Sequence, residues 1–325
     1  MNGTAPAHTR QGAGATPEDG TGRPPTVLAV PNCSEGSDPD ILAALADACR
    51  VPGARVLDQH ADPDHDRTVL TVAGHPMGVQ DALFRLAETC VDLIDLRWKR
   101  GAHPRVGALD VCPMVALTEA DAPLAGEVAM GLADRIGRDL DVPVFLYGSL
   151  ATNPMRTRPH DFRTGGIDAL AEELDNGHLT PDAGPPRLHP TAGCVLVGVR
   201  PPLVAWNVWL PHASLAEARA IADRVRESGG GLPSVRALGL YLPTAGMAQV
   251  SMNLEDPWRV TPWMVMSRVR GEADRLGVEV GDSELVGLIQ RGPIGAVAPM
   301  ALGLRRFTPA DLLDAQCPAL RRDHP

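Results

Sequence analysis

SVRALGLYLPTAGMAQVSMNLEDP, residues 234–257, holds two strand-like runs at 235–242 and 248–254. Strand-like runs at 193–199 and 203–210 and an amphipathic helix at 214–227 come before it. A helical segment at 262–276 and a short strand at 278–280 follow. Strand-helix-strand-strand-helix-strand is the order of the split βαβ unit. The second half is therefore predicted to form a ferredoxin-like layer of sheet and helix.

The first half reads similarly, with an extra helix and strand. Strands are expected at 27–30, 54–57, 68–72, 109–117 and 144–147, and helices at 39–50, 76–94 and 118–140. Asp38 before Pro39 is a suitable N-cap with a first-turn proline. A polar loop is expected at 58–67 and an irregular, functional or flexible segment at 151–190. The fold class is α/β (α+β), with two sheet-and-helix layers and a cleft between them.

These patterns divide the chain into four regions. We expect a disordered leader at 1–25, an N-terminal subdomain at 26–180, a C-terminal subdomain at 181–291 and a tail at 292–325. The leader lacks the apolar core of a signal peptide. No apolar run reaches the roughly 18 residues that span a bilayer. We therefore expect a soluble protein with no membrane partner.

Composition limits the function classes. The chain has 325 residues, 44% of them hydrophobic and 22% charged, and a formal net charge of −10. A broad nucleic-acid-binding surface needs clustered Lys and Arg, so no nucleic-acid partner is expected. The cysteines form no CxxC pair and suit neither a zinc ribbon nor a disulfide scaffold. We interpret them as buried thiols in a reducing cytoplasm: Cys33, Cys49, Cys90, Cys112, Cys194 and Cys317.

The segment GAHPRVGALDVCP, residues 101–113, carries the clearest chemistry. His103 and Arg105 share a Gly/Pro-rich turn just before an apolar strand. Pro104 restricts the backbone of His103, and the glycines permit close approach of a ligand. A histidine placed there can carry protons near neutral pH. A turn histidine with structural hydrogen bonds is the alternative.

This segment resembles the His-Pro-Arg-x-Gly-Ala-x-Asp-Val-Cys-Pro signature of glutamate formimidoyltransferases. Five further stretches resemble that family in the same order. They are VPNCSEG (30–36), DRTV (66–69), PDAGP with HPTAG (181–185 and 189–193), QVSMNL (249–254) and SELVGL (283–288). The resemblance covers about residues 27–288. Six ordered matches are far more specific than one short motif.

The resemblance implies two α/β subdomains with a substrate tunnel between them, and a homodimer. It implies transfer of a formimino group from N-formimino-L-glutamate to N5 of tetrahydrofolate, a co-substrate, with no metal. His103 stands at the position of the family's catalytic histidine. The folate-binding loop falls on Gly184, Pro185, Pro186, Arg187, Leu188, His189, Pro190, Thr191, Ala192 and Gly193.

Two sets of polar residues are candidates for substrate contacts. Arg67, Arg105 and Arg200 can bind carboxylates bidentately, although ion pairs within the protein are equally good interpretations. Asn32, Asn207 and Asn253 border the expected cleft and are candidates for pterin or amide contacts. Strand-end asparagines also serve as plain turn formers.

Several polar positions depart from the family pattern. The usual Asp-x-Asp reads Asp58-Gln59-His60, so His60 replaces a likely partner of the catalytic histidine. Asp66 replaces Asn, Ala102 replaces Glu, and Pro201 replaces Lys. Near the end, the family's Leu-Val-Gly-Leu-Val-Pro reads Leu285-Val286-Gly287-Leu288-Ile289-Gln290 in this sequence. We take His60 as a second catalytic candidate. Another donor or acceptor, or a non-catalytic folate-binding homologue, remain alternative functions.

The run His60, Asp62, Asp64, His65 and Asp66 also allows a transition-metal hypothesis. Its spacing matches no zinc or calcium motif. A solvated acidic loop is the simpler interpretation.

Overall fold

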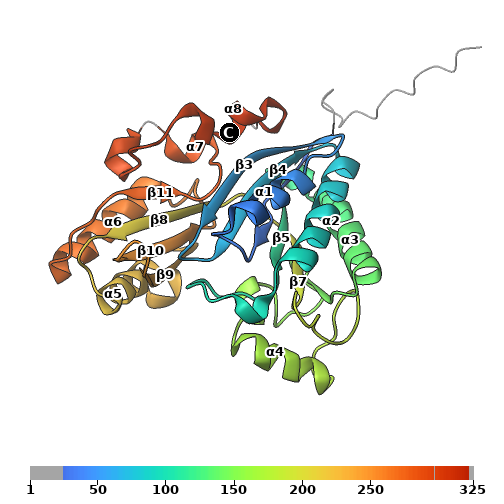
Figure 1. Cartoon of the computed structure of the whole chain (residues 1–325). Helices are drawn as coiled ribbons and strands as arrows, with labels where there is room; N and C mark the ends of the chain where they lie inside the picture. Colours follow the sequence, from blue (N-terminus) through green and yellow to red (C-terminus); the bar gives the residue numbers. More distant parts are fainter. Residues whose placement is uncertain (1–24, 296, 322–325) are drawn as a thin grey trace, which may run out of the picture.

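The N-terminal half of the protein folds around the first sheet, which contains strands β1 to β7 (Figure 1). The computed structural model describes residues 25–295 and 297–321, so the expected leader lies almost wholly outside the described residues. Two short strands lie end to end between β4 and β5 and pair with both. β7 pairs in parallel with β5 and β6. The strands are β1 (Val27–Ala29), β2 (Asn32–Cys33), β3 (Ala54–Asp62), β4 (Arg67–Gly74), β5 (Leu109–Val115), β6 (Val144–Gly148) and β7 (Val195–Arg200).

Helices α1 (Pro39–Ala48), α2 (Pro76–Leu93) and α3 (Ala122–Asp139) share one core with this sheet. The Asp38 side chain accepts hydrogen bonds from the amides of Asp40 and Ile41, so α1 begins where the sequence predicts. Leu83 of α2 and Leu132 of α3 pack in the same buried cluster as Val72 of β4. The short helix α4 (Gly166–Asp175) packs with a separate cluster that includes Val111 and Leu196. The sheet therefore contributes residues to two separate hydrophobic clusters.

The second sheet is antiparallel, in the order β11-β8-β10-β9. Its strands are β8 (Val204–Leu210), β9 (Val235–Leu242), β10 (Met247–Leu254) and β11 (Ser283–Leu285). Helices α5 (Leu215–Val225) and α6 (Pro262–Leu276) bury one of its faces. Ser214 and Glu217 form a capping box at α5, and Gly277 ends α6 at φ +68°. The prediction of two α/β layers is confirmed.

Four details differ from the sequence-based expectation. β7, grouped with the second half by its position in sequence, belongs to the first sheet because β5 and β6 pair with it. The last strand is Ser283–Leu285 rather than 278–280. The polar stretch 58–62 is strand, because it pairs with residues 67–71 of β4. The irregular segment 151–190 contains α4 and the 3-10 turn Pro159–Phe162.

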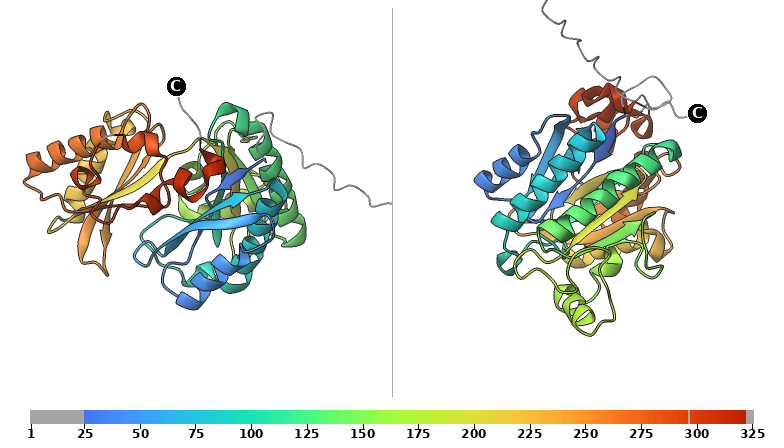
Figure 2. Two further views of the ribbon diagram at one scale, coloured as in Figure 1. Left: turned by 90° about the horizontal axis from the view of Figure 1, so that it is seen from above. Right: turned by 90° about the vertical axis from the view of Figure 1, so that its right-hand side faces the viewer.

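The C-terminal tail lies across the junction of the two lobes (Figure 2). It holds α7 (Arg291–Ile294), α8 (Leu313–Gln316) and the 3-10 turns Pro299–Leu302, Pro309–Asp311 and Pro318–Leu320. Leu312 packs with the core of the second sheet, whereas Leu313 and Leu320 pack on Leu28 and Val115 of the first. Shorter 3-10 turns elsewhere are Leu96–Trp98, Glu119–Asp121 and Glu227–Gly229.

Across the described part of the chain, none of the helices combines the length and the apolar character that a membrane span requires.

Candidate active site

The segment carrying His103 is fastened to the turn that joins β3 to β4. The amide of Ala102 donates to the carbonyl of Asp64 at 3.0 Å. The Arg105 guanidinium donates to the carbonyls of His65 at 2.8 Å and Asp66 at 2.9 Å. A Cβ on Gly101 would lie 2.1 Å from the His65 carbonyl oxygen, so glycine is required there. The turn 63–66 and the His103 segment therefore form one unit.

The His103 imidazole is held by the backbone. Its Nδ1 lies 2.8 Å from the carbonyl oxygen of Pro104, which can only accept a hydrogen bond. This contact places the proton on Nδ1 and leaves the lone pair of Nε2 available. The ring stacks on His65 with centroids 6.1 Å apart. Burial, followed by the positive charges of Arg67 and Arg163, lowers the pKa of His103 well below its usual value. His103 is consequently a neutral base at neutral pH.

A buried ionic cluster lies beside this histidine. Asp110 of β5 accepts from Arg67 Nη1 at 2.7 Å and also binds Arg163. The amide of Val106 donates to the other oxygen of Asp110 at 2.7 Å. Burial opposes ionisation of Asp110, but Arg163, Arg67 and the Val106 amide outweigh it and hold the pKa of Asp110 well below its usual range. Arg67 Nε donates to Asn32 at 3.0 Å. The cluster therefore contains two cations and one anion.

Arg163 and His65 were not among the site residues that the sequence predicted. Arg163 follows the 3-10 turn Pro159–Phe162, within the segment whose length alone suggested a functional role. His65 entered only through the metal hypothesis. Neither residue stands in a recognisable local motif, and both reach the site through contacts distant in sequence.

The turn 63–66 also joins the two sheets. His65 Nε2 lies 2.9 Å from Gln249 Oε1 of β10, and both side chains are buried. The Asp64 carboxylate accepts from the amides of Thr244 at 2.8 Å and Ala245 at 3.2 Å, in the β9–β10 turn. The histidine pair thus lies where the N-terminal sheet meets the second one.

The three predicted carboxylate-binding arginines have different surroundings. Arg67 lies in the site, bound to Asp110 and Asn32. Arg105 is occupied by the backbone of the turn 63–66. Arg200 ends β7, and its Nη1 donates to the carbonyl of Pro201 at 3.0 Å. The structure therefore brings Arg67 and Asn32 to the ionic cluster, while Arg105 holds the His103 segment in place.

The predicted folate loop ends against the His103 segment. The carbonyl of Ala192 accepts from the amide of Ala108, and that of Thr191 accepts from the amide of Leu96, each at 2.9 Å. His189 Nδ1 accepts from the amide of Ala192 at 3.0 Å, which closes the loop on itself. Gly193 has φ +70°, and a Cβ there would lie 2.2 Å from the Val106 carbonyl oxygen. The loop and the histidine are linked through residues 106–108.

The remaining candidates lie farther along the two sheets. Asn207 of β8 is buried and donates to Glu284 at 3.1 Å. Asn253 of β10 is exposed. His60 of β3 pairs with Val69 of β4, on the same face of the strand as Asp58. Burial raises the pKa of Asp58, and His60 partly offsets that rise. The ring that stacks on His103 is that of His65.

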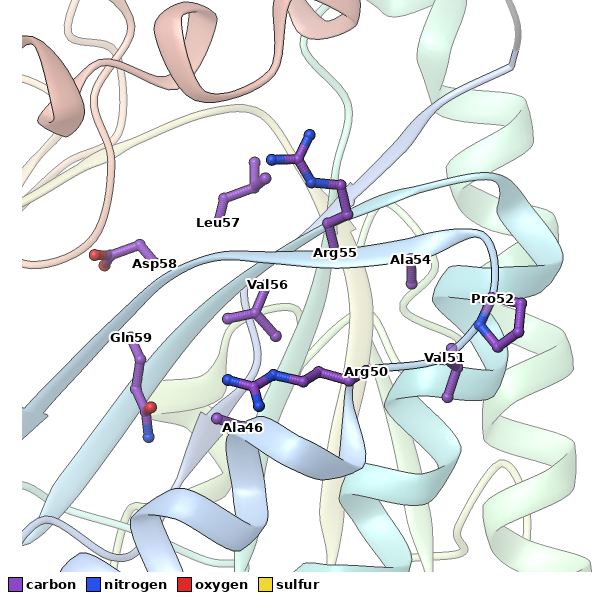
Figure 3. Close-up of a pocket in the computed structure, with 10 residues that line it drawn as sticks. All are labelled: Ala46, Arg50, Val51, Pro52, Ala54, Arg55, Val56, Leu57, Asp58 and Gln59. Atoms are coloured by element: carbon purple, nitrogen blue, oxygen red, sulfur yellow. The ribbon is translucent and has the colours of Figure 1, made fainter.

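A surface hollow of about 500 Å³ lies elsewhere, between α1 and the edge strand β3 (Figure 3). Residues 50–52 and 54–59 line it together with Ala46, and His103 is not among them. Within residues 25–295 and 297–321, no group of three or more His, Cys, Asp or Glu side chains is placed to hold a metal ion.

Comparison with known proteins identifies the family to which this architecture is similar. The profile described as formiminotransferase domain, N-terminal subdomain, matches residues 26–200, and that of the formiminotransferase domain matches residues 205–299. Glutamate formimidoyltransferase of Streptococcus pyogenes serotype M1 is 36% identical over 86% of this chain and 94% of its own length. The enzyme of that name from Thermoplasma acidophilum is 35% identical over 89% and 96%, respectively.

A longer relative matches over part of its length. Formimidoyltransferase-cyclodeaminase of Rattus norvegicus is 37% identical over 81% of this chain but 50% of its own length. The two profiles together cover both sheets, and the two shorter relatives are covered almost in full. The chain therefore belongs to the formiminotransferase family and is a transferase.

Proposed function

We propose that this protein transfers the formimino group of N-formimino-L-glutamate to N5 of tetrahydrofolate, with His103 as general acid and base. The family and the names of its relatives support the reaction and its folate co-substrate. The observation that carries the role of His103 is its Nδ1 contact to the Pro104 carbonyl, which leaves Nε2 free to accept a proton.

The reaction needs one base that becomes an acid. N5 of tetrahydrofolate attacks the amidine carbon and forms a tetrahedral intermediate, and Nε2 of His103 takes the proton from N5. The same proton passes to the glutamate nitrogen as its bond to carbon breaks, which releases glutamate. A neutral imidazole with a lowered pKa is ready for the first step and becomes a strong acid for the second. Binding both substrates face to face lowers the remaining barrier.

We propose that residues 184–193 hold the folate and that Asn32, Arg67, Asn207 and Asn253 contribute substrate contacts. The hydrogen bonds between this loop and residues 106–108 support a site that adjoins His103. His60, at a position where the family has Asp, favours a second candidate, the same transfer from a different formimino donor. A homodimer is also expected, and light scattering of the purified chain would test it.

The first prediction is that His103→Ala lowers turnover by roughly 10²–10⁴-fold, the range typical of a general acid–base group. A coupled assay with tetrahydrofolate and several formimino donors measures it. Folinic acid should bind as before, because the ring is lost but the backbone remains. His178→Ala, at an exposed histidine outside the site, is the control. Full activity of His103→Ala would remove this histidine from the mechanism.

A further inference from the structure

The ionic cluster around Asp110 has more positive than negative charge. Arg67 and Arg163 both bind the one carboxylate of Asp110, which is fully buried. Asp110 is ionised, because its pKa is held well below the usual range. One positive charge is left over in a partly dehydrated part of a protein whose formal net charge is −10. Such an excess cation is stable only where an anion can complete it.

Within the cluster, Arg163 has a buried donor without a hydrogen-bond partner in the described part of the chain. Its side chain is 13% exposed, and Nη2 is bound to Asp110. Its Nε is buried and has no hydrogen-bond partner among the described residues. By contrast, Arg67 Nε donates to Asn32 and Nη1 donates to Asp110. Both terminal nitrogens of Arg105 donate to the turn 63–66. An unpaired buried guanidinium nitrogen is costly, so this donor is available to an acceptor that the described residues do not supply.

We infer that Arg163 is the carboxylate-binding residue of the amino-acid donor, fixed in place by Asp110. This inference rests on the proposed function and adds the part of the site that selects the donor. Guanidinium groups bind carboxylates through planar N–H donors, and Nε is a donor of Arg163 that the described residues leave unpaired. The ligand class is an α-amino acid whose nitrogen carries the formimino group.

The chemistry of the donor explains why a carboxylate belongs beside His103. In a formimino amino acid the α-carboxylate is two bonds from the nitrogen that leaves. His103 must protonate that nitrogen, so the carboxylate has to bind close to the imidazole. Val106, three residues after His103, donates its amide to the Asp110 that holds Arg163. The glutamate carboxylates of folate are separated from N5 by an aromatic group, which favours the donor as the occupant.

The test compares Arg163→Gln and Arg163→Lys with Arg158→Gln, an exposed arginine of the same segment. Arg163→Gln should raise KM for formiminoglutamate by roughly 10- to 100-fold, the loss expected for a hydrogen bond to a charged group. KM for tetrahydrofolate should stay unchanged. Calorimetric binding of glutamate, the product, should weaken in parallel. Arg163→Lys keeps the charge without the planar donors, so its KM should be intermediate.

The pH profile tests whether the charge of Arg163 acts on His103, and the change in donor KM tests whether Arg163 binds the donor. The charged and titratable groups facing His103 are Arg67 on β4, His65 in the turn 63–66, Asp110 on β5 and Arg163. Arg163 lowers the pKa of His103, so its removal raises that pKa. Because the neutral imidazole is the active form, the acid limb of kcat/KM should move to higher pH in Arg163→Gln and stay in place in Arg158→Gln.

Three results would overturn the inference in a folded variant. They are unchanged donor KM and glutamate binding, a KM change confined to tetrahydrofolate, or the same loss in Arg158→Gln. If Arg163→Gln fails to fold, Arg163→Lys decides by the same criteria. The proposed function fails separately, if the wild-type protein does not turn over formiminoglutamate. Glutamate binding that depends on Arg163 would still establish the carboxylate site in that case.

Discussion

The surroundings of His103 change its pKa from the value that its residue type alone would give. A free imidazole has a pKa of about 6.5, and burial together with Arg67 and Arg163 brings that of His103 well below it. The base is therefore still neutral in mildly acidic solution, and the acid limb of kcat/KM should lie below about pH 6.5. The Pro104 carbonyl accepts the Nδ1 proton, which leaves Nε2 as the nitrogen available for the proposed proton transfer.

The role of His60, like that of His103, stays a prediction. If it belongs to the proton network, His60→Asp should increase formiminoglutamate turnover, because a carboxylate stabilises the imidazolium of His103. The same negative charge would raise the pKa of His103 and move the acid limb to higher pH. If His60 instead contacts an unusual donor, the substitution should abolish activity on that donor. A donor panel assayed across pH distinguishes the two outcomes.

The control for this experiment is Gln59→Asp, which adds the same charge one residue away at an exposed position of β3. Successive side chains of a strand point to opposite faces, so this carboxylate lies on the other side of the sheet. Equal effects of both substitutions would indicate a general charge effect. No effect of His60→Asp on rate, pH profile or donor preference would place His60 outside the site.

At the scale of elements, local patterns predicted most of the helices and strands. The helix α2 followed from apolar residues at helical spacing, and α1 from Asp38 and Pro39. The polar stretch 58–62 was misread because its strand is at the sheet edge, where an alternating, half-exposed pattern resembles a loop. β7 could not be assigned to its sheet, because pairing partners are not encoded in a strand's own sequence.

The candidate site residues also divide into those that local motifs predicted and those that they did not. His103, Arg67 and the loop 184–193 stand in recognisable motifs, so the family resemblance could propose them as site residues. The contact of Arg163 with Asp110 spans 53 residues and that of His65 with Gln249 spans 184. Such contacts depend on the tertiary fold, within the N-terminal subdomain for Arg163 and between the two sheets for His65, and no periodicity or spacing predicts them.

The loop 184–193 carries the element-scale prediction. Folinic acid, a stable mimic of the N5-substituted product, should slow amide hydrogen exchange in this loop, because the bound ligand covers its backbone. Residues 106–108 should be protected as well, since they hydrogen-bond to Ala192 and Cys194. The connection from α5 to β9, around residues 227–232, is the internal control. Unchanged exchange at saturating folinic acid would place the folate site elsewhere.

At the scale of the whole molecule, two connections hold the sheets together. One is the turn 63–66, which binds Gln249 and the β9–β10 turn and also fastens the His103 segment. The other is the C-terminal tail, which packs on both cores (Figure 2). Residues 300–321 extend beyond the family profile, which ends at 299. The relative position of the sheets, and with it the site, therefore depends partly on this tail.

Leu312 and Leu313 make the coupling testable, because adjacent side chains serve different sheets. Leu312 belongs to the core of the second sheet, whereas the Leu313 side chain is 4% exposed and belongs to the cluster on the first. Leu313→Ala should lower the free energy of unfolding by about 2–5 kcal/mol, as buried leucine truncations do. Met300→Ala, at a tail position 65% exposed, should change it by less than about 0.5 kcal/mol.

The informative measurement is urea unfolding followed by tryptophan fluorescence. Four of the five tryptophans, Trp206, Trp209, Trp258 and Trp263, lie in the second subdomain, so the signal reports mainly on the sheet whose core does not include the Leu313 side chain. If the tail couples the two sheets into one cooperative unit, Leu313→Ala shifts this fluorescence transition to lower urea by the full destabilisation. If the transition stays where it is while hydrogen exchange in β1 and β5 accelerates, the sheets unfold independently. The tail would then stabilise the first sheet without connecting it to the second.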